Sequence, residues 1–244
     1  MTYFTNNLDQ KIAYKFFKGK SPGIIYIHGL TSDMEGKKAQ SIEKYAKKRK
    51  ISFLKFDCRG HGKSFGKFEN FTISDWKKDL LDIIDNIAKG PQILIGSSMG
   101  GWLMLLAAKS RKSRIAGLIG LAPAADFTKY LFNEIPKKNR IEINKKGISK
   151  VKLWNYNYTF TKNLFKDGNK NLVLKKKLSL NKPIILIHGL LDEPVSPKIS
   201  EKISTKISSK KVEIRFLKNS NHELSNNYEL KVINNAIDNL LKII

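Results

Sequence analysis

The stretch that decides the fold is Gln92-Ile93-Leu94-Ile95-Gly96-Ser97-Ser98-Met99-Gly100-Gly101-Trp102. Residues 92–95 predict a buried strand, because a strand covered on both faces carries an unbroken apolar run. Residues 99–110 predict a helix, and a Gly-x-Ser-x-Gly pattern lies between the two elements. This strand–turn–helix arrangement presents its central serine on a sharp turn that larger residues beside it would block. The two glycines frame Ser98 rather than Ser97, so Ser98 is the candidate nucleophile.

A serine hydroxyl needs an adjacent base to act as a nucleophile at neutral pH, and the chain has four histidines. His28, His61 and His188 each precede a glycine near a strand end, which predicts roles in turns. His222 lies in a polar loop, after the last predicted strand and before the final helix. In enzymes with this elbow the base follows both the serine and the acid along the chain. We therefore predict that His222 is the base.

The acid is expected after a strand that lies between Ser98 and His222. Strand 183–187 leads into a turn that contains Asp192, whose carboxylate would accept the N–H of His222 and fix its tautomer. Asp126, which follows strand 115–121, is the main alternative, and Glu193 is a weaker one. We favour Asp192.

Two backbone N–H groups are predicted to stabilise the negative charge that develops on a carbonyl oxygen under attack. The first is that of Met99, directly after the serine. The second is that of Leu30, in the turn His28-Gly29-Leu30-Thr31 at the end of strand 24–27. Each such donor is worth ~2.7–4 kcal/mol of transition-state stabilisation. We interpret the loop at 57–64 as structural. Asp57, Arg59 and His61 would form its scaffold, and Cys58 would fill space rather than act as a nucleophile.

The rest of the chain alternates short strands with helices, which predicts a mostly parallel sheet with helices on both faces. Ser32 and Glu35 have the spacing of a capping box at the start of the first helix. The predicted strands are 24–27, 51–56, 92–95, 115–121, 183–187 and 212–217, after an edge hairpin at 3–17. The predicted helices are 35–50, 72–89, 99–110, 197–208 and 224–243.

Residues 126–181 interrupt this alternation. They are basic and rich in asparagine and aromatic residues, and an unstructured loop of that length is improbable inside a compact domain. We predict a mainly helical cap inserted into a single domain that spans residues 1–244. The cap aromatics and Met99 or Trp102 are candidates for the lining of an apolar substrate pocket.

Composition narrows the class of protein. With 244 residues, 41% of them hydrophobic and 27% charged, the chain is typical of globular proteins. Its single cysteine excludes an internal disulfide and argues against a zinc site made of cysteines. We find no apolar run long enough to span a membrane, and the first residues lack the layout of a secretion signal. We therefore expect a cytoplasmic protein without a transmembrane segment.

The formal net charge of +25 suggests an alternative, a protein that binds polyanions or an anionic membrane surface. However, the 46 basic residues include only six arginines, the side chain best suited to phosphates and bases. Lysine, asparagine and isoleucine, all encoded by A/T-rich codons, are abundant together. We favour an A/T-rich genome composition as the cause of the high positive charge, and we expect no nucleic-acid partner.

Together these motifs resemble the α/β-hydrolase superfamily. Within it the chain is most similar to the α/β-hydrolase-domain family of mitochondrial palmitoyl-protein thioesterases and acyl-glucuronide esterases. The similarity extends from about residue 10 to residue 241, and includes the stretches 18–23, 93–105, 135–147, 188–193 and 220–222.

This resemblance implies the α/β-hydrolase fold, with Ser98 as nucleophile, Asp192 as acid and His222 as base. It implies hydrolysis of small-molecule or lipidated esters or thioesters through an acyl-enzyme, without cofactor or metal. The alternative from another class is a binding protein on the same scaffold that has lost turnover. The sequence leaves the oligomeric state open.

Overall fold

The computed structural model describes residues 1–154 and 156–244, so one residue of the predicted cap, Asn155, lies outside the described residues. The strands are β1 (Thr2–Thr5), β2 (Lys11–Phe17), β3 (Lys20–Ile27), β4 (Ile51–Phe56), β5 (Gln92–Ser97), β6 (Ile115–Leu121), β7 (Ile148–Leu153), β8 (Tyr156–Thr161), β9 (Ile184–Gly189) and β10 (Val212–Leu217). The α-helices are α1 (Lys37–Arg49), α2 (Ile73–Asn86), α3 (Met99–Ser110), α4 (Thr128–Glu134), α5 (Lys137–Lys146), α6 (Lys162–Lys170), α7 (Lys198–Lys206) and α8 (Asn227–Ile243).

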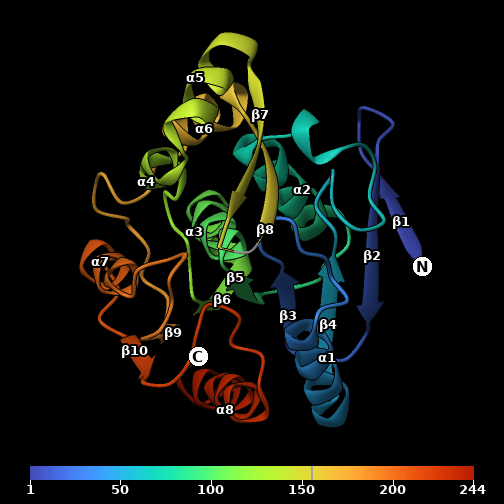
Figure 1. The fold of residues 1–244 in the computed structure, drawn as a ribbon. Coiled ribbons are helices and arrows are strands. Elements are labelled where there is room, and N and C mark those ends of the chain that lie inside the picture. Colours follow the sequence, from blue (N-terminus) through green and yellow to red (C-terminus); the bar gives the residue numbers. More distant parts are fainter. Residues whose placement is uncertain (155) are drawn as a thin grey trace.

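The described residues form an eight-stranded sheet with the order β1-β2-β4-β3-β5-β6-β9-β10 (Figure 1). Strands β1 and β2 form the predicted antiparallel hairpin, and β2 pairs antiparallel with β4. From β4 to β10 every pairing is parallel. The predicted mostly parallel sheet is therefore confirmed. In such a sheet the carboxyl ends of the parallel strands meet at one edge, which is where a site is expected.

Apolar runs in the central strands supply both faces of this sheet, because successive side chains point in opposite directions. In β3, Ile24 and Tyr26 belong to the core under α1 and α8, whereas Ile25 and Ile27 belong to the core under α2 and α3. Figure 1 shows α1 and α8 on one side of the sheet and α2 and α3 on the other.

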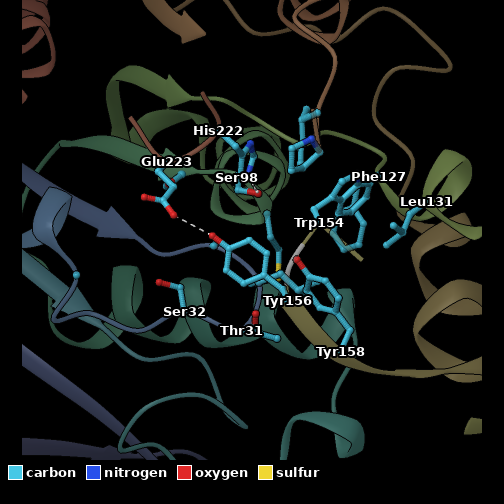
Figure 2. Close-up of a pocket in the computed structure, with 18 of the residues that line it drawn as sticks. Thr31, Ser32, Ser98, Phe127, Leu131, Trp154, Tyr156, Tyr158, His222 and Glu223 are labelled. Atoms are coloured by element: carbon cyan, nitrogen blue, oxygen red, sulfur yellow. Dashed lines mark hydrogen bonds between the residues drawn. The ribbon is translucent and has the colours of Figure 1, made fainter. Parts of the chain in front are cut away.

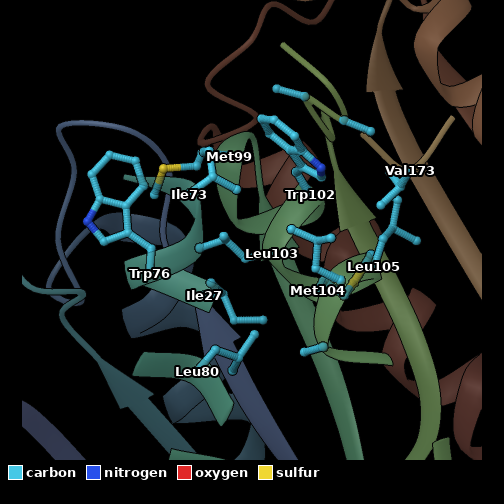
Figure 3. Packing of buried hydrophobic residues seen from close by; sticks show 14 of the residues in the cluster. Ile27, Ile73, Trp76, Leu80, Met99, Trp102, Leu103, Met104, Leu105 and Val173 are labelled. Atoms are coloured by element: carbon cyan, nitrogen blue, oxygen red, sulfur yellow. The ribbon is translucent and has the colours of Figure 1, made fainter. Parts of the chain in front are cut away.

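Helix α3 is apolar around almost its whole circumference, as expected for a helix enclosed on all sides. Every residue from Met99 to Ala108 is buried. In Figure 3, Ile73, Trp76 and Leu80 of α2 pack beside Met99 and Leu103 of α3. The helix that follows the serine is thus fixed by packing along its length.

The predicted start of the first helix is wrong. Helix α1 begins at Lys37 after Gly36, and no side chain among the described residues caps it. The carboxylate of Glu35 instead lies 2.8 Å from the ammonium of Lys15 and 3.0 Å from that of Lys55. Lys55 is buried, so its charge needs carboxylate partners more than the helix end needs a cap.

The chain between β6 and β9 contains helices α4, α5 and α6, and it also contains the antiparallel hairpin β7–β8, which we did not predict from the sequence. Three aromatic residues, Tyr156, Tyr158 and Phe160, alternate along β8. The rings of Tyr158 and Phe160 stack with their centroids 5.0 Å apart. Figure 1 shows this segment above the edge of the sheet where the parallel strands end.

The two ends of this segment meet at one side chain. The carboxylate of Asp126 accepts hydrogen bonds from the backbone N–H groups of Val173, at 2.7 Å, and Leu174, at 2.9 Å. Asp126 has a φ of 60°, a left-handed conformation that aspartate tolerates better than most residues. The cap is therefore anchored where it leaves the sheet. Among the described residues, no helix combines the length and apolar character needed to cross a membrane.

Candidate active site

Ser98 occupies a strained position between β5 and α3. Its backbone has φ 52° and ψ −118°, a conformation that is rare for residues other than glycine. Three hydrogen bonds hold it there: its N–H donates to Leu121 (2.9 Å), and its carbonyl accepts from Gly101 (2.9 Å) and Ala124 (3.0 Å). The turn directs the half-buried Ser98 side chain into a cavity.

The glycines of the pattern are required by close backbone contacts. A Cβ atom on Gly96 would lie 2.3 Å from the carbonyl oxygen of Gly100, and one on Gly100 would lie 2.3 Å from that of Ile27. We therefore expect Gly100→Ala to lower the free energy of unfolding by about 3 kcal/mol, because backbone must shift to admit a methyl group. Thermal unfolding should show a Tm about 6–12 °C lower.

The control for this variant is Gly36→Ala, since a Cβ at Gly36 meets nothing within 4 Å. Its Tm should stay within about 2 °C of the unmodified protein. Equal Tm values for the two variants would contradict this account of the elbow.

The structure brings the three residues predicted as nucleophile, base and acid into one chain of contacts. Nε2 of His222 lies 3.0 Å from Oγ of Ser98, and Nδ1 lies 2.7 Å from Oδ2 of Asp192. The three side chains follow β5, β9 and β10, so all lie at the carboxyl edge of the sheet.

Asp192 is held as a carboxylate in a buried turn. Burial by itself raises the pKa of Asp192, but hydrogen bonds from His188 and His222 outweigh it and leave the pKa below its usual range. The other carboxylate oxygen, Oδ1, accepts the N–H of Val195 at 2.8 Å. An ionised acceptor at this position keeps the hydrogen of His222 on Nδ1 and leaves Nε2 free to accept a proton.

The alternatives left open by the sequence lie elsewhere. Asp126 binds the cap backbone, and Glu193 is exposed. Ser97 is buried, with its hydroxyl next to the phenol of Tyr26. In the described part of the chain, none of the three contacts the ring of His222 through a hydrogen bond.

Leu30 and Met99, whose backbone N–H groups are the predicted oxyanion donors, both line the cavity beside Ser98. Across the described residues, neither group has an acceptor within the protein. The contacts of His28 restrict the orientation of the peptide group that contains the N–H of Leu30. Its Nδ1 lies 2.7 Å from the carbonyl oxygen of Gly29, and its Nε2 accepts the N–H of Cys58 at 3.0 Å. Burial lowers the pKa of His28, so its ring is neutral.

The carbonyl of Gly29 and the N–H of Leu30 belong to the same planar peptide and point in opposite directions. Because His28 holds the carbonyl, the N–H of Leu30 is turned away from the ring of His28. A Cβ on Gly29 would lie 3.2 Å from that of Ser98, which shows how closely this turn approaches the serine.

The loop after β4 is structural. Asp57, Arg59 and His61 are buried. Arg59 donates to Asp79 from Nε at 2.6 Å, and Asp57 accepts from the N–H groups of Met34 and Lys63. Cys58 is also buried, and burial raises the pKa of its thiol, which disfavours the thiolate.

A cavity of about 410 Å³ opens next to Ser98. In Figure 2, apolar side chains lie on one side of the serine, and polar ones on the other. The apolar side carries Phe127, Leu131, Trp154 and Tyr158, and the polar side carries Thr31, Ser32 and Glu223. Tyr156 lies between these sides and donates from its hydroxyl to Glu223 at 2.9 Å. This bond joins the cap hairpin to the loop of His222.

The prediction that Trp102 lines the pocket is wrong. Its side chain is 0% exposed, and within the described residues the wall of the cavity does not include it. Its indole N–H donates to the carbonyl of Asn171 at 3.1 Å, and its ring packs edge-on against Phe127, which does line the cavity. Trp102 is kept out of the cavity wall because it packs between α3 and the cap. Met99, the other candidate, does line the cavity.

Several lining residues were missed in the sequence analysis. Leu131 comes from the start of the cap, and Glu223 is the neighbour of the predicted base. Phe127, Trp154, Tyr156 and Tyr158, which also line the cavity, are among the cap aromatics named as candidates. The alternation of aromatic residues at 154, 156, 158 and 160 was an available signal for the unpredicted strand β8, since a period of two is typical of a strand with one buried face.

Known proteins resemble this chain in sequence and in fold. The family model described as "Serine aminopeptidase, S33" matches residues 21–156, more than half of the chain. The human protein "Palmitoyl-protein thioesterase ABHD10, mitochondrial" is 38% identical over 246 residues, which cover 98% of this chain and 79% of that protein. The structure of mouse alpha/beta hydrolase domain-containing protein 10 superimposes with a TM-score of 0.92 at 34% identity, over 99% of this chain and 98% of the other.

The chain belongs to the α/β-hydrolase family. A further solved structure, from Agrobacterium vitis S4, matches this α/β hydrolase with a TM-score of 0.91 at 27% identity, over 98% of this chain and 97% of that one. The predicted fold class, a mostly parallel sheet with helices on both faces and an inserted helical cap, is thus confirmed for this α/β hydrolase.

Proposed function

We propose that this α/β hydrolase is a serine hydrolase that cleaves carboxylic esters or thioesters through an acyl-enzyme. The single observation that carries the proposal is the chain of contacts from Ser98 through His222 to Asp192, with distances of 3.0 and 2.7 Å. These distances are within the reach that proton transfer between a nucleophile and a base requires.

In the proposed reaction, Nε2 of His222 takes the proton of Ser98 as Oγ attacks the substrate carbonyl. Asp192 stabilises the imidazolium that forms, and the N–H groups of Leu30 and Met99 bind the oxyanion. His222 then gives its proton to the leaving alcohol or thiol, which departs and leaves an ester on Ser98. His222 next takes a proton from water, whose oxygen attacks the carbonyl carbon of that ester. As the bond between this carbon and Oγ of Ser98 breaks, His222 returns the proton to Oγ, and the carboxylic acid leaves.

The two sides of the cavity suggest how the substrate lies. The apolar side, with Phe127, Leu131 and Trp154, suits the acyl chain, since an alkyl group gains free energy when it leaves water. The polar side suits the leaving group. The name of the human relative, a palmitoyl-protein thioesterase, supports an acyl substrate and a thioester bond for this chain as well.

The test is a panel of p-nitrophenyl esters of graded chain length, acyl thioesters and an amino-acid p-nitroanilide. We expect turnover of esters or thioesters, and a fluorophosphonate adduct whose mass locates on the peptide that contains Ser98. Folded protein that neither turns over the panel nor forms the adduct would favour the binding protein. Turnover of the anilide alone would favour an aminopeptidase.

The bond between Tyr156 and Glu223 leads to a prediction on substrate binding. Tyr156→Phe removes the hydroxyl that joins the cap hairpin to the loop of His222. We expect KM for a long-chain ester to rise about two- to fivefold, on the order of 0.4–1 kcal/mol for an exposed charged hydrogen bond. Steady-state kinetics measure this change in KM with an octanoyl ester as the long-chain substrate and an acetyl ester as the short-chain one.

Tyr158→Phe is the matched control, since among the described residues the hydroxyl of Tyr158 has no hydrogen-bond partner. Its KM should change less than about twofold. Equal changes in the two variants would mean that the bond to Glu223 has no part in binding.

A further inference from the structure

The carboxylate of Asp192 has a second imidazole beside it, that of His188. Nε2 of His188 lies 3.1 Å from Oδ2 of Asp192, the same oxygen that contacts His222. The side chains of His188 and Asp192 are both 0% exposed. The reaction proposed above does not use His188.

The contacts of His188 fix which nitrogen carries its hydrogen. Nε2 lies 2.9 Å from the carbonyl oxygen of Val195, which can only accept a hydrogen bond, so Nε2 must be protonated. Nδ1 lies 2.8 Å from Oγ of Ser200, a buried hydroxyl on α7. A hydroxyl can donate, so the neutral ring with the hydrogen on Nε2 satisfies both contacts. His28 has the opposite tautomer, because its Nε2 accepts from the N–H of Cys58.

We propose that His188 is a positioning residue for the reaction, and that its Nε2–H, shared between the carbonyl of Val195 and Oδ2 of Asp192, fixes the acid against His222. The inference rests on the proposed function.

The turn from Asp192 to Val195 explains why such a group is needed. The N–H of Val195 binds Oδ1, and His188 binds both the carbonyl of Val195 and Oδ2. The carboxylate is therefore held at both oxygens by one short turn and one ring. Without His188, the described residues that oppose rotation of the carboxylate are Val195, through its N–H, and His222, which is the group to be oriented.

The experiment compares two replacements that differ in where they place an N–H. In His188→Gln the amide nitrogen lies as many bonds from Cβ as Nε2, so the donor to Asp192 is kept. In His188→Asn a polar group remains near Nδ1 and that donor is lost. We expect kcat of His188→Asn to fall about 10- to 100-fold, since misplacement by about 1 Å can cost that much. KM should change less than about twofold, because the orientation of the acid matters in the transition state.

We expect His188→Gln to recover kcat to within about threefold of the unmodified enzyme. A folded His188→Asn with unchanged kcat would overturn the inference, as would a His188→Gln that is folded and equally impaired. Ser200→Ala, which removes the partner of Nδ1, should lower kcat by about two- to fivefold. Ser204 is on the same helix, and its hydroxyl donates to the carbonyl of Glu201 instead. Ser204→Ala should therefore leave kcat unchanged.

A spectroscopic measurement on the unmodified enzyme tests which ring nitrogen of His188 carries its hydrogen, and it needs no variant. Long-range ¹H–¹⁵N correlation of the imidazoles in the unmodified enzyme distinguishes protonated from bare ring nitrogens. We expect Nε2–H for His188 and Nδ1–H for His28, and a bare Nε2 on His188 would overturn the inference. Absence of turnover in the unmodified enzyme would instead contradict the proposed function, so the two failures are distinguishable.

Discussion

Replacing Ser98 with alanine lowers kcat for the best ester of the panel by about a million-fold, as removal of a triad serine does elsewhere. The loss is this large because no acyl-enzyme forms and the imidazole of His222 has no hydroxyl to deprotonate. Residual catalysis of about 10³–10⁴ over water is expected from the oxyanion donors and binding. The measurement is single-turnover kinetics at high enzyme concentration, with intrinsic fluorescence to verify the fold.

Ser97→Ala is the control for this variant. Ser97 is the neighbouring serine, but it is buried beside Tyr26 and is not framed by the two glycines. Its kcat should remain within about tenfold of the unmodified enzyme. Retention of turnover in Ser98→Ala, or a collapse of turnover in Ser97→Ala, would assign the chemistry to another residue.

Asp192→Asn is expected to lower kcat by about ten-thousand-fold with the fold intact. The side chains have the same shape, and the amide oxygen of asparagine can still accept the N–H of Val195. However, the amide can present N–H to Nδ1 of His222, which then carries its hydrogen on Nε2. In that tautomer the nitrogen that faces Ser98 cannot accept a proton. The pH dependence of kcat and a thermal melt complete the measurement.

Asp126→Asn is the matched comparison, because both aspartates follow strands and were alternatives for the acid. Here the amide loses one acceptor for the N–H groups of Val173 and Leu174. We expect the Tm of Asp126→Asn to fall by about 2–8 °C, while its kcat stays within about threefold of the unmodified enzyme. The opposite pattern, with turnover lost in Asp126→Asn and kept in Asp192→Asn, would exchange their roles.

The site residues that could be predicted are those whose surroundings are local in sequence. A strand, a glycine-framed serine and a helix follow one another within 92–110, and the backbone conformation at Ser98 results from these neighbours. His222 and Asp192 were also accessible, because each follows a strand and chain order limits the choice.

What could not be predicted depends on contacts between distant parts of the chain. Trp102 lies on a helix that is apolar all round, so the sequence cannot tell which side faces the cavity and which faces the cap. Tyr156 and Glu223 are 67 residues apart, and their bond exists only because the hairpin β7–β8 extends over Ser98. Glu35 has the spacing of a cap, but the buried ammonium of Lys55 competes for it.

The anchoring of both ends of the cap at Asp126 has a consequence for how such enzymes diversify. Because the excursion from β6 to β9 begins and ends at one carboxylate, its two ends lie close together on the sheet framework. Lengthening a flexible excursion twofold adds only about 0.6 kcal/mol of closure entropy. Segments of other lengths and compositions could therefore be joined to the same two ends, provided that they still cover Trp102, so that selectivity can change while the catalytic residues stay the same.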